Sequence, residues 1–307
     1  MAFSQGSRAG LSYVVESVFG TTPETPSLIQ LPYTTHSLNL TKERVTGTDI
    51  QPDRMLRVDR HGNRSVAGDI VADLRKGDYD NFLESAFFNT FSTNVLKIGT
   101  TPKYFSIEDS ATDIDQFRLF TGMAVSSLAV SIRPNQMVTA TFGMVGKDMS
   151  ISGTSVDATK TAPTGNAPFD AYSGALSIGN AGGSLSASAI VTGIDFTLNN
   201  ALAPTFVVGS SSTPQLEYGM ATVEGTITAY FEDAALINRF INETETGLQV
   251  VVDDPTGSSD YTWLFPRVKI NGADVPVDGP TSRIINLPFV ALYDSVEATN
   301  IKLTRSA

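Results

Sequence analysis

The spacing of hydrophobic residues changes from a period of two to a helical period at two places in the chain. Alternation predicts a strand near residue 70, and an amphipathic helical stripe follows near residue 85. The same succession occurs near residues 226 and 238. The first copy consists of Val66, Gly68, Ile70 and Ala72 followed by Phe82, Leu83, Ala86 and Phe87, and the second of Val223, Gly225, Ile227 and Ala229 followed by Leu236, Ile237, Phe240 and Ile241.

The segments around these two units correspond in order as well. Leu38 and Leu40 precede the first strand nearly as Phe196 and Leu198 precede the second, and each half closes with an alternating strand that ends in an aspartate. Strand and helix pairs are common, so chance similarity is the alternative interpretation. Four elements in the same order favour an old duplication instead.

Only two segments have helical spacing, Tyr79–Asn89 and Ala234–Asn242. Asp78 and Asp233 stand just before them, and we expect both to be N-caps, because a carboxylate there accepts hydrogen bonds from the first helical amides. The remaining patterned segments alternate with a period of two, which predicts strands. They are Lys103–Glu108, Phe117–Phe120, Ala124–Ile132, Met137–Met144, Ser188–Leu198, Ala221–Phe231, Gly247–Val252, Tyr261–Ile270 and Ser282–Leu292. The chain is therefore predicted to be mainly β, with antiparallel strands and two short flanking helices.

The pattern divides the chain into four parts. Residues 1–34 are rich in Gly, Ser, Thr and Pro and suggest an N-terminal arm, which could lie on its own subunit or reach a neighbour. Residues 35–149 form the first unit and residues 188–307 the second. Residues 150–187 between them predict a connector with one weak strand at Ala175–Ile178.

Composition narrows the possible functions. The 307 residues include 21 basic and 32 acidic side chains, for a formal net charge of -11, which argues against wrapping nucleic acid by neutralising its phosphates. An acidic channel wall would still let DNA slide past without sticking. There are no cysteines, no signal-peptide pattern and no apolar run approaching a membrane span, so we expect a soluble protein made in the cytoplasm.

A locally basic loop spans residues 42–64 of this acidic chain. It carries Lys42, Arg44, Arg54, Arg57, Arg60 and Arg64 against the acidic Glu43, Asp49, Asp53 and Asp59. One interpretation is a solvated hairpin whose charges pair with each other. The other is a docking loop, because a positive protrusion on a negative subunit is complementary to further copies of itself. DNA binding is the least favoured, since acids are interleaved and no aromatic residue is available to stack on bases.

The chain lacks recognisable catalytic equipment. His36 and His61 are its only histidines and have no metal-ligand spacing, and no phosphate-binding loop or nucleophile elbow occurs. Acidic pairs occur at 108–109, 113–115, 243–245 and 253–254, but they lie in predicted turns, where acids are expected. The 109–115 stretch also lacks the glycine and terminal glutamate of a calcium loop. We therefore predict no enzymatic activity, no cofactor and no metal.

Several motifs resemble the major tail tube proteins of long-tailed bacteriophages. They are SYVVESVFGTTPETP at 12–26, VAGDIVADLRKGDYDNFLESAFFNTF at 66–91, and the blocks VEGTITAYFEDAALINRFINE, YTWLFPRVKI and LPFVALYD in the last third. The resemblance implies a β-sandwich or split barrel with a flanking helix in each half. It also implies that the sheets of neighbouring subunits join into a ring-shaped β-barrel. Since a single unit of that family forms hexameric rings, two units per chain would give a trimeric pseudo-hexamer, with a hexamer of chains as the alternative.

The resemblance also assigns faces and partners. If barrel strands alternate between core and lumen, Asp69 and Asp73 would face the lumen in the first half, and Glu224 and Thr226 in the second. The basic loop would make contacts between subunits or between rings. The expected partners are further copies of the chain, a tape measure protein, tail terminator and tail-tip proteins, and genomic DNA in transit, with no membrane. The expected location is the virion tail, after assembly in the host cytoplasm.

One alternative function remains open at this stage. An extracellular or surface β-sandwich module, for instance one that binds carbohydrate, would need an exposed aromatic platform. Trp263 is the only tryptophan, and its place in an alternating strand indicates the core.

Overall fold

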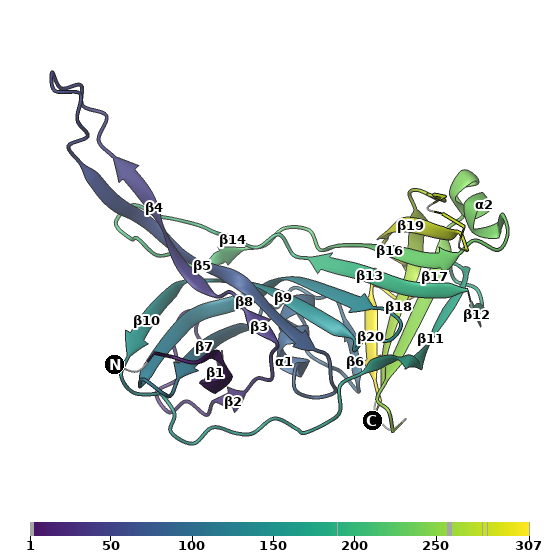
Figure 1. Ribbon diagram of the computed structural model, residues 1–307, viewed down its shortest axis with the longest axis horizontal. Helices are drawn as coiled ribbons and strands as arrows, with labels where there is room; N and C mark the ends of the chain where they lie inside the picture. Colours follow the sequence, from purple (N-terminus) through teal and green to yellow (C-terminus); the bar gives the residue numbers. More distant parts are fainter. Residues whose placement is uncertain (1–2, 189, 257–259, 278, 281, 307) are drawn as a thin grey trace.

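The computed structural model describes residues 3–188, 190–256, 260–277, 279–280 and 282–306, and it is mainly β (Figure 1). A short 3₁₀ turn covers Gly6–Arg8, and the two α-helices are α1 (Asp80–Phe87) and α2 (Ala235–Ile241). The longer strands are β1 (Ala9–Glu16), β4 (Asn39–Thr46), β5 (Asp59–Asp73), β7 (Tyr104–Ala111), β8 (Gln116–Ile132), β9 (Thr139–Gly146), β10 (Asp148–Ser152), β11 (Asp170–Asn180), β13 (Val191–Asn199), β16 (Thr222–Tyr230), β17 (Thr246–Asp253), β18 (Asp260–Ile270), β19 (Ile284–Ala291) and β20 (Lys302–Arg305). The shorter strands are β2 (Ile29–Gln30), β3 (Thr35–His36), β6 (Val95–Lys97), β12 (Leu185–Ala187), β14 (Ala203–Pro204) and β15 (Leu216–Glu217).

One antiparallel sheet crosses from the first half of the chain into the second. It runs in the order β4, β5, β9, β8, β13, β16, β19, and we call it the central sheet. The crossing point is the pairing of β8 with β13, where Leu128 faces Leu198. The sequence predicts antiparallel strands, and the structure confirms this.

Each half also carries strands that leave the central sheet. The first part of β8 pairs with β7 on one edge and with β10 on the other, and β7 in turn pairs with β1. In the second half β18 pairs with β17 and with β20, and β17 pairs with β11. Figure 1 shows α2 at the far end of the second half, well away from the projecting β4 and β5.

The hydrophobic core lies between the central sheet and these additional strands, and it is continuous across both halves. Val66, Ile70 and Ala72 of β5 are fully buried, as the alternating pattern predicts. Trp263 of β18 is also buried, and its ring lies 5.1 Å from that of Phe196 and 6.3 Å from that of Phe87 on α1. Aromatic packing of this kind fixes the second half against the first.

Gly68 interrupts the core side of β5 for a steric reason. Its φ is +152°, and a Cβ there would come within 2.5 Å of the carbonyl oxygen of Ser37. The glycine therefore permits the close approach of residues 37–38 to β5 and does not contribute a side chain to the core.

The two helices are confirmed, but neither predicted cap residue occupies the N-cap position. Asp78 is two residues before α1, and its carboxylate accepts a hydrogen bond from the Thr164 amide at 2.7 Å, so it anchors the connector. Asp233 lies just before the N-cap residue Ala234 and accepts a hydrogen bond from Ala235 N at 2.7 Å. It therefore satisfies one of the first helical amides, although it is not the N-cap residue.

The N-terminal segment and the connector are both built into the body of the chain. Of the two placements left open for residues 1–34, the structure has β1 paired along its full length with β7 of the same chain. The connector is joined to the first half through backbone hydrogen bonds such as that from Gln30 N to Thr161 O at 2.9 Å. It contains the strand β11, which is longer than the predicted 175–178.

Candidate functional site

The face of the central sheet that points away from the core is polar and acidic. Register places the outward positions of neighbouring strands opposite one another, as in Thr197 facing Ala129 on one side and Glu224 on the other. Asp69 and Glu224 are exposed on this face, and Asp73 and Thr226 are partly exposed. The four residues predicted to face a lumen thus share one face of one sheet.

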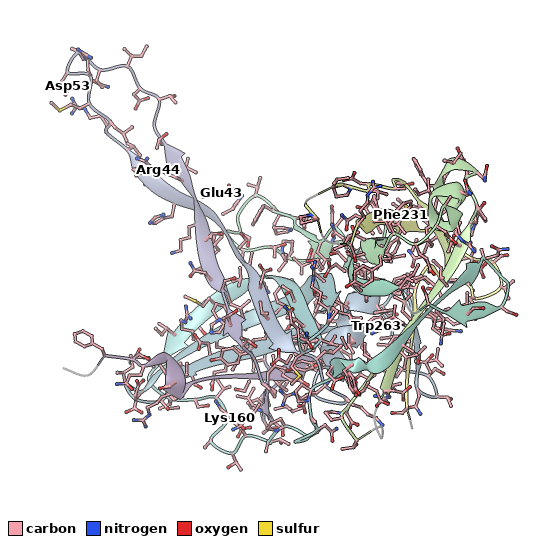
Figure 2. The ribbon with its side chains drawn as sticks, turned by 45° about the vertical axis from the view of Figure 1, so that its right-hand side comes forward. Glu43, Arg44, Asp53, Lys160, Phe231 and Trp263 are labelled. Carbon is pink, nitrogen blue, oxygen red and sulfur yellow. The ribbon has the colours of Figure 1, made fainter. Side chains whose placement is uncertain are left out.

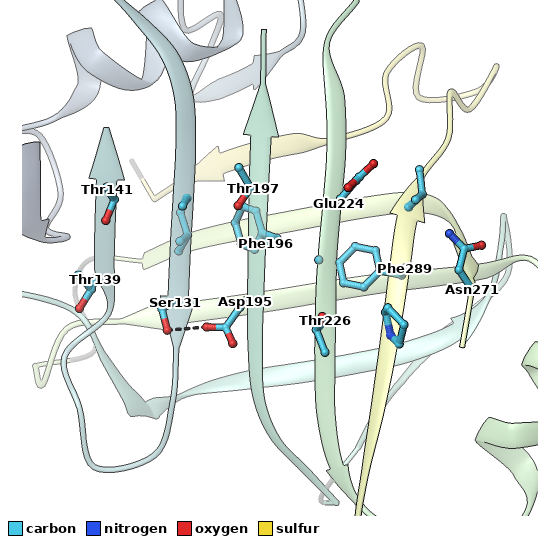
Figure 3. A pocket seen from close by; sticks show the side chains of 15 residues that line it. Ser131, Thr139, Thr141, Asp195, Phe196, Thr197, Glu224, Thr226, Asn271 and Phe289 are labelled. Atoms are coloured by element: carbon cyan, nitrogen blue, oxygen red, sulfur yellow. Dashed lines mark hydrogen bonds between the residues drawn. The ribbon is translucent and has the colours of Figure 1, made fainter. Parts of the chain in front are cut away.

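A hollow of about 590 Å³ lies on this face over β8, β9, β13, β16 and β19 (Figure 3). Figure 3 shows Ser131, Asp195, Thr197, Glu224 and Thr226 on adjacent strands, with Thr139 and Thr141 beside them. Ser131 donates a hydrogen bond of 2.5 Å to Asp195, which also forms an ion pair with Arg133. The polar side chains that line the hollow are mainly hydroxyls and carboxylates, and neither histidine is among them.

The charge of this face is negative. Asp195 is neutralised by Arg133, whereas Asp69, Asp73 and Glu224 have no ion-pair partner among the described residues. Their neighbours are mostly small threonine, serine, alanine and glycine side chains. A surface with this charge repels phosphates.

The second distinctive feature is a hairpin that projects from the body. Strands β4 and β5 continue beyond the central sheet and carry the segment 47–58 far from the other elements (Figure 1). Figure 2 shows Asp53 near its tip and Arg44 along its length. The sequence predicts a loop at 42–64, and the structure shows instead that its two ends, 42–46 and 59–64, form a two-stranded ribbon on either side of 47–58.

Half of the predicted basic cluster is neutralised within the chain. Arg44 pairs with Asp59, Arg57 with Asp53, and Arg64 with Asp148 of β10. Lys42, Arg54 and Arg60 have no ion-pair partner in the described structure. The hairpin is thus partly self-paired, and its remaining excess of positive charge is modest.

The hairpin also exposes hydrophobic side chains that the sequence reasoning missed. Ile50 is 98% exposed, Met55 68% and Leu56 57%. Val45 and Val58 beside them are also exposed. A group of exposed apolar residues at a projecting tip indicates a contact surface for another molecule. The only sequence signal for it is the presence of these residues in an otherwise charged and polar loop.

The acidic pairs considered for catalysis have structural roles. Glu108 is fully buried. Its carboxylate oxygens accept hydrogen bonds from Ser155 Oγ at 2.8 Å, Val156 N at 2.8 Å and Lys160 Nζ at 2.7 Å. Asp109 beside it pairs with Arg118 and lies 3.7 Å from His36 Nε2. Burial by itself would raise the pKa of Asp109, but His36 and Arg118 together lower it below its usual range.

Carboxylates of two further pairs are engaged in a similar way. Glu243 and Glu245 form ion pairs with Lys269 and Arg267, which lower the pKa of each carboxyl. Asp113 accepts hydrogen bonds from Ser4 and from the Gln5 amide. Within the described residues no group of three or more potential ligands is placed to hold a metal ion, and neither helix could cross a membrane.

The chain is thus a mainly β protein that combines a polar, acidic sheet face with a projecting hairpin. The chain belongs to the phage tail tube protein family, whose model matches residues 6–291. No curated protein matches the sequence. The protein is therefore a structural, non-enzymatic component of the virion tail that forms the tail tube, and tail tube proteins self-polymerise. The alternative of a carbohydrate-binding module loses its main candidate, because Trp263 is buried.

Proposed function

We propose that each chain supplies two equivalent units of the tube wall, so that three chains close one ring of the tail tube. The observation that supports this most directly is the order of strand pairings, which occurs twice. Each strand pairing of the first half has a counterpart in the second. The matches are β1–β7 with β11–β17, β7–β8 with β17–β18, β8–β10 with β18–β20, β8–β9 with β18–β19, β9–β5 with β19–β16, and β5–β4 with β16–β13. One helix follows the matching strand in each half, α1 after β5 and α2 after β16.

This proposal moves the boundary between the units. In the matched order β11 corresponds to β1, so the second unit begins at Asp170 and not at residue 188. The first unit then includes β1, and the connector shortens to residues 153–169. An arm in front of the first unit would be limited to the residues before β1.

The acidic face of the central sheet is the proposed wall of the lumen. It belongs to a sheet that already spans both units, and a closed ring of such sheets would present Asp69, Asp73 and Glu224 to the channel. Carboxylates repel the DNA backbone, and small hydroxyl side chains leave the wall smooth. Genomic DNA would thus pass during ejection without specific binding.

The projecting hairpin is the proposed contact between stacked rings. An isolated two-stranded ribbon is marginally stable in water, and its exposed apolar tip gains stability when a partner covers it. The corresponding segment of the second unit, residues 200–221, behaves differently. Leu202 and Leu216 pack with Phe88 and Ala124 of the first unit, so that segment lies on its own chain. A ring of three chains would therefore carry three projecting hairpins and not six.

Other expected partners follow from this role. A tape measure protein would occupy the lumen during assembly, and tail terminator and tail-tip proteins would cap the two ends of the tube. Assembly would take place in the cytoplasm of the host bacterium.

Ring stoichiometry tests the proposal. Purified protein is assembled into tubes and dispersed to single rings, and the mass of a ring is measured by native mass spectrometry. We expect three chains per ring, with an approximate sixfold pattern in end-on electron micrographs. A ring of six chains would overturn the two-unit proposal, and a protein that stays monomeric at high concentration would overturn the tube assignment as well.

A further inference from the structure

We propose that the ring closes by pairing residues 271–277 of one chain with residues 36–41 of the next, in the register that already joins the two units within a chain. This inference rests on the ring proposed above and specifies the contact between its chains. The partner is a second copy of this chain, and the interaction is antiparallel strand pairing between two free edges.

The junction of β8 with β13 serves as the template. Leu128 faces Leu198 with both side chains buried in the core, and Ala129 faces Thr197 on the acidic side. Asn200 N donates to Ser126 O at 2.8 Å, so even-numbered residues of both strands exchange backbone bonds across the junction. Ala129 and Thr197 are then a pair without backbone hydrogen bonds between them.

The first free edge is that of β3 and β4. Among the described strands these two pair only with β5. Ser37 N donates to Asp69 O at 2.9 Å, so alternation directs the backbone groups of His36, Leu38 and Leu40 away from β5.

The second free edge follows the end of β18. Asp274 and Asn286 exchange backbone hydrogen bonds of 3.0 and 2.9 Å, which holds residues 271–277 beside β19. Ala273 and Val275 therefore direct their backbone groups to the opposite side, where the structure describes no strand. Val275 O accepts a hydrogen bond from Arg283 at 2.8 Å, and its second lone pair is left for another donor.

The matched registers fix which residues should meet. Ala67 and Glu224 each follow the valine at the matching position of β5 and β16, and they pair with Asn39 and Thr197 respectively. Asn39 is thus the counterpart of Thr197.

The other strand is placed by the same reasoning. Thr141 and Asn286 match because they pair with the matching residues Val71 and Thr228. Thr141 also pairs with Ala129, and Asn286 with Asp274. Asp274 is thus the counterpart of Ala129, and since Ala129 faces Thr197, Asp274 should face Asn39 of the next chain.

The side chains on the two edges fit this register. Leu38 is buried toward the core and Leu40 partly so, and the opposing Ala273 and Val275 pack against the core of the second unit. Asn39 and Asp274 are both exposed, as lumen positions should be before the ring closes. The contact would extend both the hydrophobic core and the acidic face from one chain to the next.

The natural chain contains no cysteine, so introduced thiols report only on the pair chosen. The test variant is Asn39→Cys with Asp274→Cys, oxidised in assembled tubes. A directly opposed pair without backbone bonds places its Cα atoms about 4.5 Å apart, within the range of about 4.4 to 6.8 Å that a disulfide spans. The positive control is Ala129→Cys with Thr197→Cys, which reproduces the same relation inside one chain. The register control is Thr35→Cys with Asp274→Cys, because Thr35 lies about 13 Å further along the strand.

We expect the test variant to give chains linked up to trimers on a non-reducing denaturing gel, the positive control to give only monomers without free thiols, and the register control to give unlinked monomers. If tubes form and the positive control oxidises while the test variant stays unlinked, the pairing is overturned and the tube role stands. If the double variant does not assemble, amide hydrogen exchange of the unmodified protein decides. We expect His36, Leu38, Leu40, Ala273 and Val275 to exchange at least tenfold more slowly in tubes than in dispersed subunits, and unchanged exchange would overturn the pairing.

Discussion

Asn200 donates its side-chain amide to the main-chain carbonyl of Ala86, 2.8 Å away, and thereby ties the end of β13 to helix α1. The same amide nitrogen lies 3.3 Å from Val125 O of β8. Asn200 is almost completely buried, so both bonds are shielded from water. The two halves of the chain are therefore joined by a specific polar contact as well as by the shared core.

Replacing Asn200 by alanine should lower the free energy of unfolding by about 1 to 3 kcal/mol, because two buried carbonyls lose their donor. Urea denaturation of the dispersed subunit measures the change. Asn271→Ala is the matched control, since that side chain is exposed and makes no hydrogen bond in the described structure, and it should change stability by less than about 0.5 kcal/mol. Equal stability of the two variants would contradict the prediction.

Acid should destabilise the protein partly through Asp109. Because its folded pKa is lowered, its contribution to stability is fully present above the usual carboxyl range near pH 4 and is lost as pH falls through the folded value. Asp109→Asn should therefore reduce stability at neutral pH and flatten the decline in stability below about pH 4. Thermal unfolding between pH 2 and 7 checks this, with the exposed Asp115→Asn as control. An unchanged acid slope in the Asp109 variant would show that this carboxylate is not responsible.

Reversing the charge of the proposed lumen should impair DNA passage without preventing assembly. In the triple variant Asp69→Lys, Asp73→Lys, Glu224→Lys the wall would attract phosphate, so ejection should slow at least tenfold at low salt and recover partly at high salt. Electron microscopy verifies the tubes, and fluorescence of a DNA dye follows ejection. The same charge change at Glu24, Asp115 and Glu232, which are exposed outside the central sheet, should leave ejection unaffected. Normal ejection kinetics in the first variant would refute the lumen assignment.

Polar substitutions at the hairpin tip should separate ring formation from stacking. Ile50→Ser, Met55→Ser and Leu56→Ser together remove the exposed apolar group, so rings should form while tubes become short or absent. Sedimentation and negative-stain microscopy distinguish the two states. Arg44→Ala with Arg57→Ala should have a much smaller effect, because exposed ion pairs contribute little. Tubes of normal length from the tip variant would rule out apolar stacking through this hairpin.

The hydrophobic pattern predicted the strands that have one buried face, and it missed strands that are exposed on both faces. β5 and β16 alternate between core and surface, and both were predicted. Most of β4 is exposed on both faces, so its hydrophobic pattern carries no signal. Two separate strands were predicted at Phe117–Phe120 and Ala124–Ile132, but the structure has a single β8 that passes through Gly122 at φ +66°.

The candidate site illustrates the same limit. Strand parity grouped Asp69, Asp73, Glu224 and Thr226 correctly on one face, although whether that face lines a lumen remains a prediction. It could not reveal the pairing of β8 with β13, which brings Ser131 to Asp195 across 64 residues of chain. Likewise, spacing suggested Asp78 as a helix cap because nothing local indicates that Thr164 takes its carboxylate.

The uninterrupted course of β8 has a mechanical consequence. Its first part is held by β7 and β10, and its second part by β9 and β13. Separating the central sheet from the strands β1, β7 and β10 would therefore require breaking backbone hydrogen bonds along one continuous strand. Separating two packed surfaces would not be enough. The backbone of β8 itself transmits force between the two sets of strands. The first unit should therefore unfold cooperatively under force or heat.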